Sequence, residues 1–133
     1  MTTEFVNPPT AFDSLPRGYS HVVKITNPNA LYFVAGAAAV DTELNVQHIG
    51  DVEGQTRLIF QNIARDLEAS GATLADIVDM TVYLADTDDQ WRVRGVRNEF
   101  FPSDKLPSST MIAVKSFCID GMLIEIDVIA ATS

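Results

Sequence analysis

Cysteine and histidine are scarce in this sequence, which has one Cys and two His among its 133 residues. The single cysteine, Cys118, excludes an intrachain disulfide and is typical of a reducing compartment. With only His21 and His48 beside it, we expect no metal site and no metal cofactor. No apolar run approaches the roughly 18 residues of a membrane span, and no basic leader precedes an apolar segment, so we expect a cytoplasmic protein without a membrane partner.

Basic residues are also few, because nine Lys and Arg stand against eighteen Asp and Glu, for a net charge of −9. Such a surface repels phosphate backbones, so we expect no nucleic-acid partner. Apolar residues, in contrast, make up 47% of the chain, and the length suits a single domain over residues 1–133. The sequence contains no internal repeat and no low-complexity segment.

Turn-forming residues are concentrated near the N-terminus. Prolines at positions 8, 9 and 16 and a glycine at 18 make residues 1–18 an irregular lead-in. Residues 21–26 have the composition of a short strand, and residues 27–29 have that of a turn. Residues 31–36 then predict a second strand, which would complete a hairpin with the first.

A helical period follows over residues 51–70, where apolar side chains recur at intervals of three and four. This stripe consists of Val52, Thr56, Ile59, Phe60, Ile63 and Leu67. Gly71 is a typical residue for ending a helix, because glycine adopts the left-handed conformation without strain. We expect the stripe to pack on a sheet.

Residues 77–84 return to strand composition. Thr87 and Gln90 have the spacing of a capping box and would open a second helix, which extends to about Phe101 and ends before Pro102. Its core side would consist of Val93, Val96 and Phe100.

Three arginines, Arg92, Arg94 and Arg97, lie within six positions of this second helix. One interpretation is a solvated basic face on an otherwise acidic protein. The other is that one of these side chains reaches into a ligand site.

The C-terminal stretch, residues 107–129, contains two apolar runs on either side of residues 118–121, which have the composition of a hairpin turn. Within the second run, Glu125 shares one strand face with Leu123, Asp127 and Ile129. A carboxylate inside an apolar strand is costly unless it has partners or a function. It is either a solvent-facing acid or a functional group.

The element order, two strands, a loop, then helix, strand, helix and two strands, predicts the α+β class. We expect a mixed β-sheet with the two helices packed on one face. The other face of the sheet would remain largely apolar, which favours self-association.

The C-terminal stretch resembles the signature of the reactive-intermediate deaminase (Rid, or YjgF-like) family. Matching residues occur in the family's order at Pro107, Thr110, Val114, Ile124, Glu125 and Ile126. The resemblance spans roughly residues 18–130, and further similar segments are 55–56, 62–63, 70–71, 76–78, 81–84 and 98–101. It implies a chorismate-mutase-like sandwich, assembled as a barrel-like homotrimer with ligand clefts between subunits.

The resemblance also implies a chemistry, in which enamines and imines such as 2-aminoacrylate are hydrolysed to ammonia and an oxo-acid. By this similarity Glu125 handles the water, and Tyr19 is a second catalytic residue. The substrate-binding positions that correspond to the family's are Arg17, Gly36, Ser109, Thr110 and Met111. No cofactor is implied.

Ser109 is the main departure, because it stands where the best-studied branch has an arginine that holds the substrate carboxylate. A serine cannot supply a charged, bidentate fork. Met111 replaces a common cysteine, and Ala35-Gly36-Ala37 replaces a common Ser-Gly-Gln. The chain thus resembles branches without the arginine, so we expect a substrate range that differs from 2-aminoacrylate. A substitute arginine would come from Arg17, the nearer candidate in the family layout, or from the second helix.

Two further functions compete with an imine hydrolase. One is a non-catalytic homotrimer that binds a small molecule. The other is the ribonuclease activity sometimes attached to this family, which the net charge of −9 and the lack of an aromatic-basic surface pattern argue against.

Overall fold

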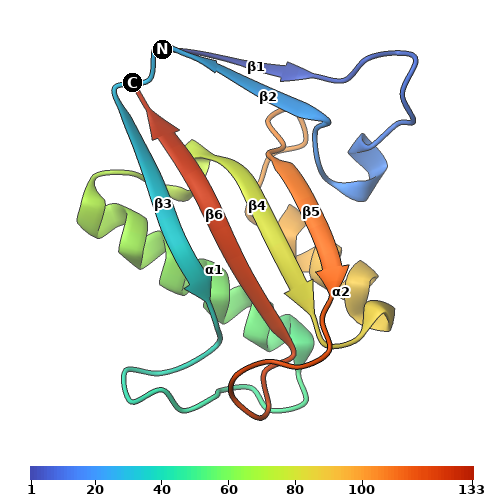
Figure 1. Cartoon of the computed structure of the whole chain (residues 1–133), viewed down its shortest axis with the longest axis vertical. Helices are drawn as coiled ribbons and strands as arrows, with labels where there is room; N and C mark the ends of the chain where they lie inside the picture. Colours follow the sequence, from blue (N-terminus) through green and yellow to red (C-terminus); the bar gives the residue numbers. More distant parts are fainter.

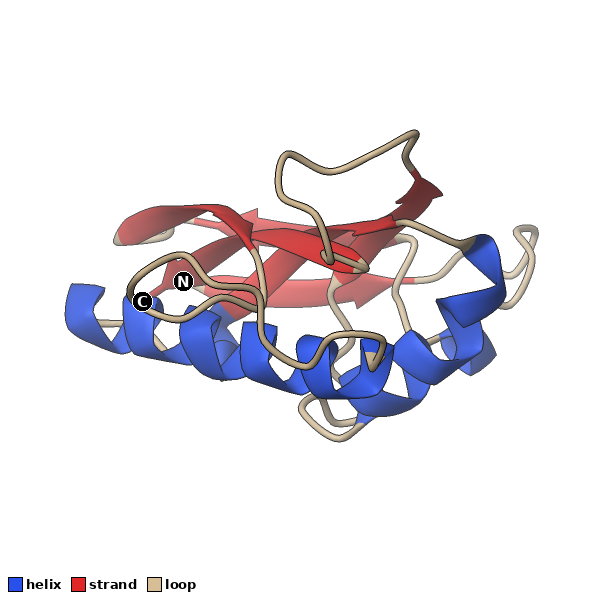
Figure 2. Ribbon diagram, turned by 90° about the horizontal axis from the view of Figure 1, so that it is seen from below, coloured by secondary structure: helices blue, strands red, loops and turns tan.

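The computed structural model describes all residues 1–133 and contains two α-helices, six strands and three short 3₁₀ turns. Their bounds in chain order are β1 Thr2–Val6, η1 Leu15–Arg17, β2 Val22–Thr26, β3 Ala30–Ala37, α1 Val52–Ser70, η2 Leu74–Asp76, β4 Ile77–Leu84, η3 Thr87–Asp89, α2 Gln90–Asn98, β5 Ser108–Ala113 and β6 Ile124–Thr132. Both helices pack against the same face of the larger sheet, as Figure 2 shows. The α+β class and the predicted layering are therefore confirmed.

The larger sheet has the strand order β3-β6-β4-β5. β6 is antiparallel to both of its neighbours, whereas β4 and β5 are parallel and are joined by a crossover through α2. The predicted hairpin around residues 118–121 is therefore wrong. The segment between β5 and β6 carries the chain past β4, so that β6 lies inside the sheet, between β3 and β4 (Figure 1).

The N-terminal region is more regular than expected. Residues 2–6 form a strand, β1, which pairs antiparallel with β2 in a separate two-stranded sheet. The predicted hairpin between residues 21–26 and 31–36 is also wrong, because β3 pairs with β6 instead. The long connection between β1 and β2 carries η1, which Figure 1 shows beside the start of β5.

Helix α1 follows the prediction closely. The side chain of Asp51 caps its N-terminus by accepting a hydrogen bond from the Gly54 N–H, and Gly71 ends it with a φ of 98°. Every residue of the predicted stripe is buried. Burial of each large apolar side chain such as Ile59 or Phe60 contributes about 1.5–3 kcal/mol, so this stripe anchors the helix layer on the sheet.

Helix α2 begins later and ends earlier than predicted. The cap at this turn is Asp86, whose side chain accepts from the Asp88 N–H, and the Thr87 capping box does not form. The helix ends at Asn98, and Phe100 is only half-buried, with its ring 4.9 Å from that of Phe60.

The face of the sheet away from the helices is mixed rather than largely apolar. Phe33 on β3 is 74% exposed, while Asp79, Glu125 and Asp127 bring carboxylates to the central strands β4 and β6. The Tyr83 hydroxyl donates to Asp127 Oδ2 at 2.9 Å, and this bond raises the pKa of Tyr83. None of the helices is long and apolar enough to cross a membrane.

Candidate functional site

A cavity of about 310 Å³ lies where the η1 turn, helix α2 and strand β5 meet. We call it the arginine pocket, and it is lined by Arg17, Tyr19, Arg94, Arg97, Ser109, Thr110 and Met111. Five of the seven site residues predicted from the sequence are in this group. The structure therefore brings together segments that are about 90 residues apart in the chain.

Gly18 allows the η1 turn to approach helix α2. Its φ of 83° is in the left-handed region, and a Cβ at this position would lie 2.7 Å from Nη2 of Arg97. The turn is tied to β5 by a hydrogen bond from the Ser20 N–H to the Pro107 carbonyl, at 3.0 Å. Tyr19 and Ser109 consequently line the same pocket.

Arg97 is the most deeply buried charged group, with 2% of the residue exposed. Its Nη1 donates to Ser109 Oγ at 3.2 Å, and its Nη2 donates to the Arg17 carbonyl at 2.5 Å. Its Nε has no hydrogen-bond partner. The Arg97 guanidinium thus lies beside the side chain of Ser109 on β5. In the family that this chain resembles, an arginine stands at this strand position.

Arg94 forms the second buried cationic wall and is 8% exposed. Its Nη1 donates to Gln90 Oε1 at 2.6 Å, and its Cζ lies 4.7 Å from the ring centroid of Trp91. The Cζ of Arg17 lies 5.8 Å from the same ring. The Nε of Arg94, like that of Arg97, is buried without a partner.

No carboxylate neutralises these two arginines, since neither Arg94 nor Arg97 takes part in any ion pair of the chain. Burial, together with repulsion from Arg94, lowers the pKa of Arg97 to about 10, against the attraction of Tyr19. Burial and repulsion from Arg17 likewise lower the pKa of Arg94. Both groups remain cationic at neutral pH, so the pocket is a concentrated positive charge in an acidic protein.

The interpretation of α2 as a solvated basic face is therefore wrong for two of its three arginines. Only Arg92 is solvated, with 68% of its side chain exposed and a weak contact to Asp89. The preference for Arg17 as the substitute arginine is also not supported by the geometry. Arg17 is exposed and offers its carbonyl, whereas Arg97 contacts Ser109.

The remaining two predicted residues, Glu125 and Gly36, lie on the other face of the sheet. Glu125 pairs with Tyr83, and Ser109 pairs with Met80, which is in the core beneath the helices. Since strand residues alternate between faces, Glu125 and Ser109 point in opposite directions. A Cβ at Gly36 would lie 2.9 Å from the Glu125 carboxyl carbon, so this glycine leaves room for the carboxylate.

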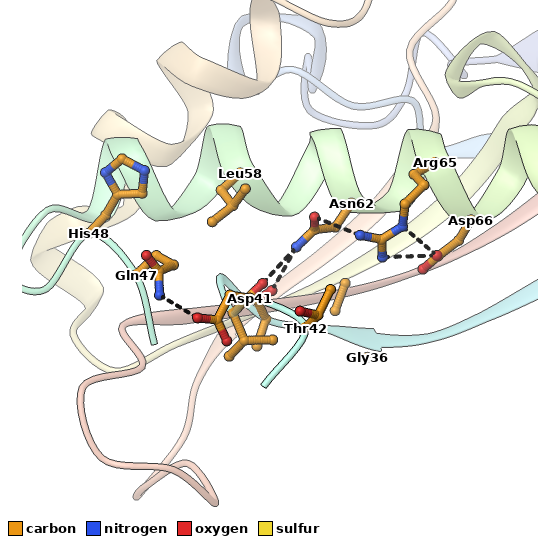
Figure 3. Close-up of a pocket in the computed structure, with 12 residues that line it drawn as sticks. Gly36, Asp41, Thr42, Gln47, His48, Leu58, Asn62, Arg65 and Asp66 are labelled. Carbon is orange, nitrogen blue, oxygen red and sulfur yellow. Dashed lines mark hydrogen bonds and ion pairs between the residues drawn. The ribbon is translucent and has the colours of Figure 1, made fainter. Parts of the chain in front are cut away.

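A larger cavity of about 840 Å³ lies between α1 and the loop after β3, and we call it the α1 cleft (Figure 3). Its polar side chains bond to one another. Gln47 Nε2 donates to Asp41 Oδ2 at 3.4 Å, and Arg65 forms an ion pair with Asp66 at 3.1 Å. Asn62 donates to the carbonyls of residues 38 and 40, so its amide also holds the loop in place.

Sequence reasoning raised Arg94 and Arg97 only as alternatives, and it missed Gln90 and Trp91. The available signal was the spacing of residues 90, 94 and 97, which recurs at intervals of four and three and therefore lies on one side of the helix.

Comparison with known proteins gives a consistent result. The family described as Endoribonuclease L-PSP matches residues 11–132. A RutC family protein of Pyrococcus abyssi is 37% identical over 112 residues, covering 84% of this chain and 84% of that protein. A second RutC family protein, from Pyrococcus horikoshii, is 36% identical over 112 residues, with coverages of 84% and 85%.

Solved structures agree with this match. Rv2704 from Mycobacterium tuberculosis, a member of the YjgF/YER057c/UK114 family, is 29% identical with a TM-score of 0.66, covering 98% of this chain and 100% of its own. The Rid-family protein YyfB from Yersinia pestis shares the fold with a TM-score of 0.87 at 24% identity, with coverages of 98% and 99%.

Proposed function

We propose, since this chain belongs to the Endoribonuclease L-PSP family of Rid and YjgF-like proteins, that it hydrolyses small imino acids and releases ammonia. The observation that carries the proposal is the buried guanidinium of Arg97, which forms no ion pair with a carboxylate and donates to Ser109. A carboxylate held there would supply the missing counter-charge. Arg97 would then take the anchoring role that the resembling branch gives to an arginine on β5.

The chemistry requires few groups. Water adds to the imine carbon and one of its protons passes to the nitrogen, which gives a carbinolamine. The remaining hydroxyl proton then passes to the nitrogen as the C–N bond breaks, and the products are a carbonyl group and ammonia. Glu125 is the proposed proton carrier, because it has a carboxylate without a hydrogen-bond partner or an ion pair in the protomer. Tyr19 lines the anchoring pocket and would orient the substrate.

A neighbouring copy of the chain is needed for this reaction. Glu125 and Ser109 face opposite sides of the sheet in one protomer, so a single chain does not bring the anchor and the proton carrier together. We propose a homotrimer in which the open sheet face of one subunit meets the arginine pocket of the next. Sedimentation equilibrium should give three times the 14.5 kDa chain mass, and a monomer at micromolar concentration would contradict this arrangement.

A binding protein without turnover is the second candidate. It is favoured by the separation of Glu125 from the arginine pocket within the protomer, since the pocket can hold an anion by itself. RNA cleavage is disfavoured, because the cationic groups are enclosed in about 310 Å³ and the chain as a whole carries −9.

The experiment that separates these functions generates imino acids in situ with an amino-acid oxidase and traps what remains with semicarbazide. We expect the protein to accelerate imine decay and ammonia release. Saturable binding without acceleration for any imine would overturn the hydrolase and leave the binding protein. Cleavage of a single-stranded RNA probe by the purified protein would overturn both.

A further inference from the structure

We infer that the arginine pocket recognises two carboxylates at once, so that its substrates are the imines of acidic, dicarboxylic amino acids. This inference rests on the proposed function, whose substrate class it narrows. A monocarboxylate would satisfy one guanidinium and leave the other buried and unpaired. The structure holds two such groups, Arg94 and Arg97, and no carboxylate of the chain is paired with either.

The two guanidinium groups are fixed independently, which makes them two anchors rather than one. Arg97 is held by Ser109 and by the Arg17 carbonyl, at the β5 side of the pocket. Arg94 is held by Gln90 and the Trp91 ring, on the side of α2. Each also keeps one buried Nε–H without a partner, so the fold does not satisfy all the donors of either guanidinium group.

The spacing of the anchors suits a short ligand with charges at both ends. Residues three apart on a helix have Cβ atoms about 5–6 Å apart, and Arg94 and Arg97 are three apart on α2. A cavity of about 310 Å³ is at the small end of ligand sites. Four- and five-carbon dicarboxylates fit this description better than a nucleotide or a peptide.

A compact dianion such as inorganic phosphate shares the required charge but not the two separated ends. Arginine recognises phosphate and carboxylate with the same planar fork. Two anchors held by different partners favour two separate anionic groups, and Arg17 adds a third, exposed cation near the Trp91 ring. The test therefore includes phosphate as its own arm.

Isothermal titration calorimetry at constant ionic strength would compare succinate, glutarate, butyrate and inorganic phosphate. We expect succinate or glutarate to bind about ten- to a hundredfold more tightly than butyrate, as expected for one additional charge-assisted contact. Equal affinity for butyrate and the dicarboxylates would overturn the inference. Tighter binding of phosphate than of either dicarboxylate would overturn it in favour of a compact dianion.

Arg94→Gln tests the second anchor directly. It should remove the advantage of the dicarboxylates and leave butyrate binding in place, because Arg97 remains. Arg92→Gln is the matched control on the same helix, since Arg92 is exposed and outside the pocket. A variant Arg94→Gln that keeps the full dicarboxylate preference would overturn the two-anchor assignment, provided that circular dichroism shows it folded.

The binding measurements test the dicarboxylate site, and the rates of imine decay test the hydrolase, so each proposal can be contradicted without the other. If succinate binds with the expected preference but imines of aspartate and glutamate decay no faster than the uncatalysed rate, the hydrolase proposal fails and the dicarboxylate site stands. If alanine-derived imine is hydrolysed as fast as the dicarboxylic imines and butyrate binds as tightly as succinate, the hydrolase stands and the dicarboxylate site fails.

Discussion

The α1 cleft and the arginine pocket differ in a way that their sizes do not reveal. The α1 cleft is the larger, at about 840 Å³ against about 310 Å³ for the arginine pocket. In the cleft, Asp41 accepts from the backbone N–H groups of Asn45 and Glu43, and its bond to Asn45 lowers its pKa. In the arginine pocket, two buried guanidinium groups have no counter-charge.

The polar side chains of the α1 cleft therefore hold a loop in place, whereas those of the arginine pocket are suited to binding a ligand. Buried polar groups normally find partners within the fold, so an unpaired one requires another explanation. Arg65 in the cleft is solvated and paired with Asp66, whereas Arg97 is buried and unpaired. The smaller hollow is therefore the better candidate for binding an anion.

The largest expected effect concerns Glu125, whose carboxyl lies against Gly36 at the edge of the α1 cleft. Glu125→Gln should slow imine hydrolysis by about a hundredfold or more, because a positioned proton carrier contributes roughly 10²–10⁴ in rate. Succinate binding should be unchanged or slightly tighter. The measurement is imine decay alongside calorimetry.

Asp66→Asn serves as the control for Glu125, since it changes a carboxylate of the α1 cleft that is already paired with Arg65. It should leave the rate unchanged. Wild-type turnover in Glu125→Gln would mean that the carboxylate has no part in the reaction and that the open sheet face contributes nothing to the site.

The second prediction compares a substitution of Arg97, in the arginine pocket, with one of Arg65, in the α1 cleft. Arg97→Met should weaken succinate binding by about a hundredfold, because it removes charge-assisted donors from a desolvated site. Arg65→Met should have no effect, since that side chain is exposed and bonded to its own neighbours. If the two variants bind succinate equally well, the contrast between the hollows has no functional meaning.

Much of the fold could be predicted from the sequence, but the strand pairing could not. The buried stripe of α1 and the bounds of β4 follow from local periodicity, and both are confirmed. Both predicted hairpins are wrong, because they assume that consecutive strands pair. The position of β6 in the middle of the sheet depends on which strands bury most apolar surface together, and that is a property of the whole chain.

The site shows the same limit. The resemblance located Tyr19 and Ser109 in one pocket, since both belong to a motif. The orientation of Arg94 and Arg97 depends on how α2 rotates against β5, and its apolar residues Val93 and Val96 only partly fix this rotation. Spacing within the helix shows that two arginines share a side, but not that this side is buried.

The third prediction uses pH to test the charge of the pocket. Since burial lowers the pKa of Arg97 to about 10, succinate affinity should be nearly constant from about pH 7 to 9. It should fall as the pH rises through about 10, because the anchor loses its proton, and reach about a tenfold loss one pH unit higher. Circular dichroism at each pH establishes that the protein stays folded. Constant affinity up to pH 11 would exclude Arg97 as the anchor.

The smallest effect is expected for stability. Lowering the pKa of Arg97 from its usual value to about 10 corresponds to about 3 kcal/mol against the charged form in the folded protein at neutral pH. The hydrogen bonds from Arg97 to Ser109 and to the Arg17 carbonyl offset this cost, at about 1.5–3 kcal/mol each when the donor is charged. The two bonds together contribute about 3–6 kcal/mol, so Arg97→Met should lower the free energy of unfolding by less than about 3 kcal/mol in the absence of ligand.

The pH dependence of the free energy of unfolding shows whether the Arg97 charge destabilises the fold or is required for it. The unfolded chain keeps the Arg97 proton to a higher pH than the folded chain, whose Arg97 has a pKa lowered to about 10. Wild type should thus gain stability relative to Arg97→Met as the pH rises above about 10, and carry the full cost below it. Urea unfolding at pH 7 and 10.5 measures this difference, with Arg65→Met as the control from the α1 cleft. A loss of several kcal/mol in Arg97→Met at pH 7 would instead make Arg97 a structural residue, held for the fold rather than for an anion.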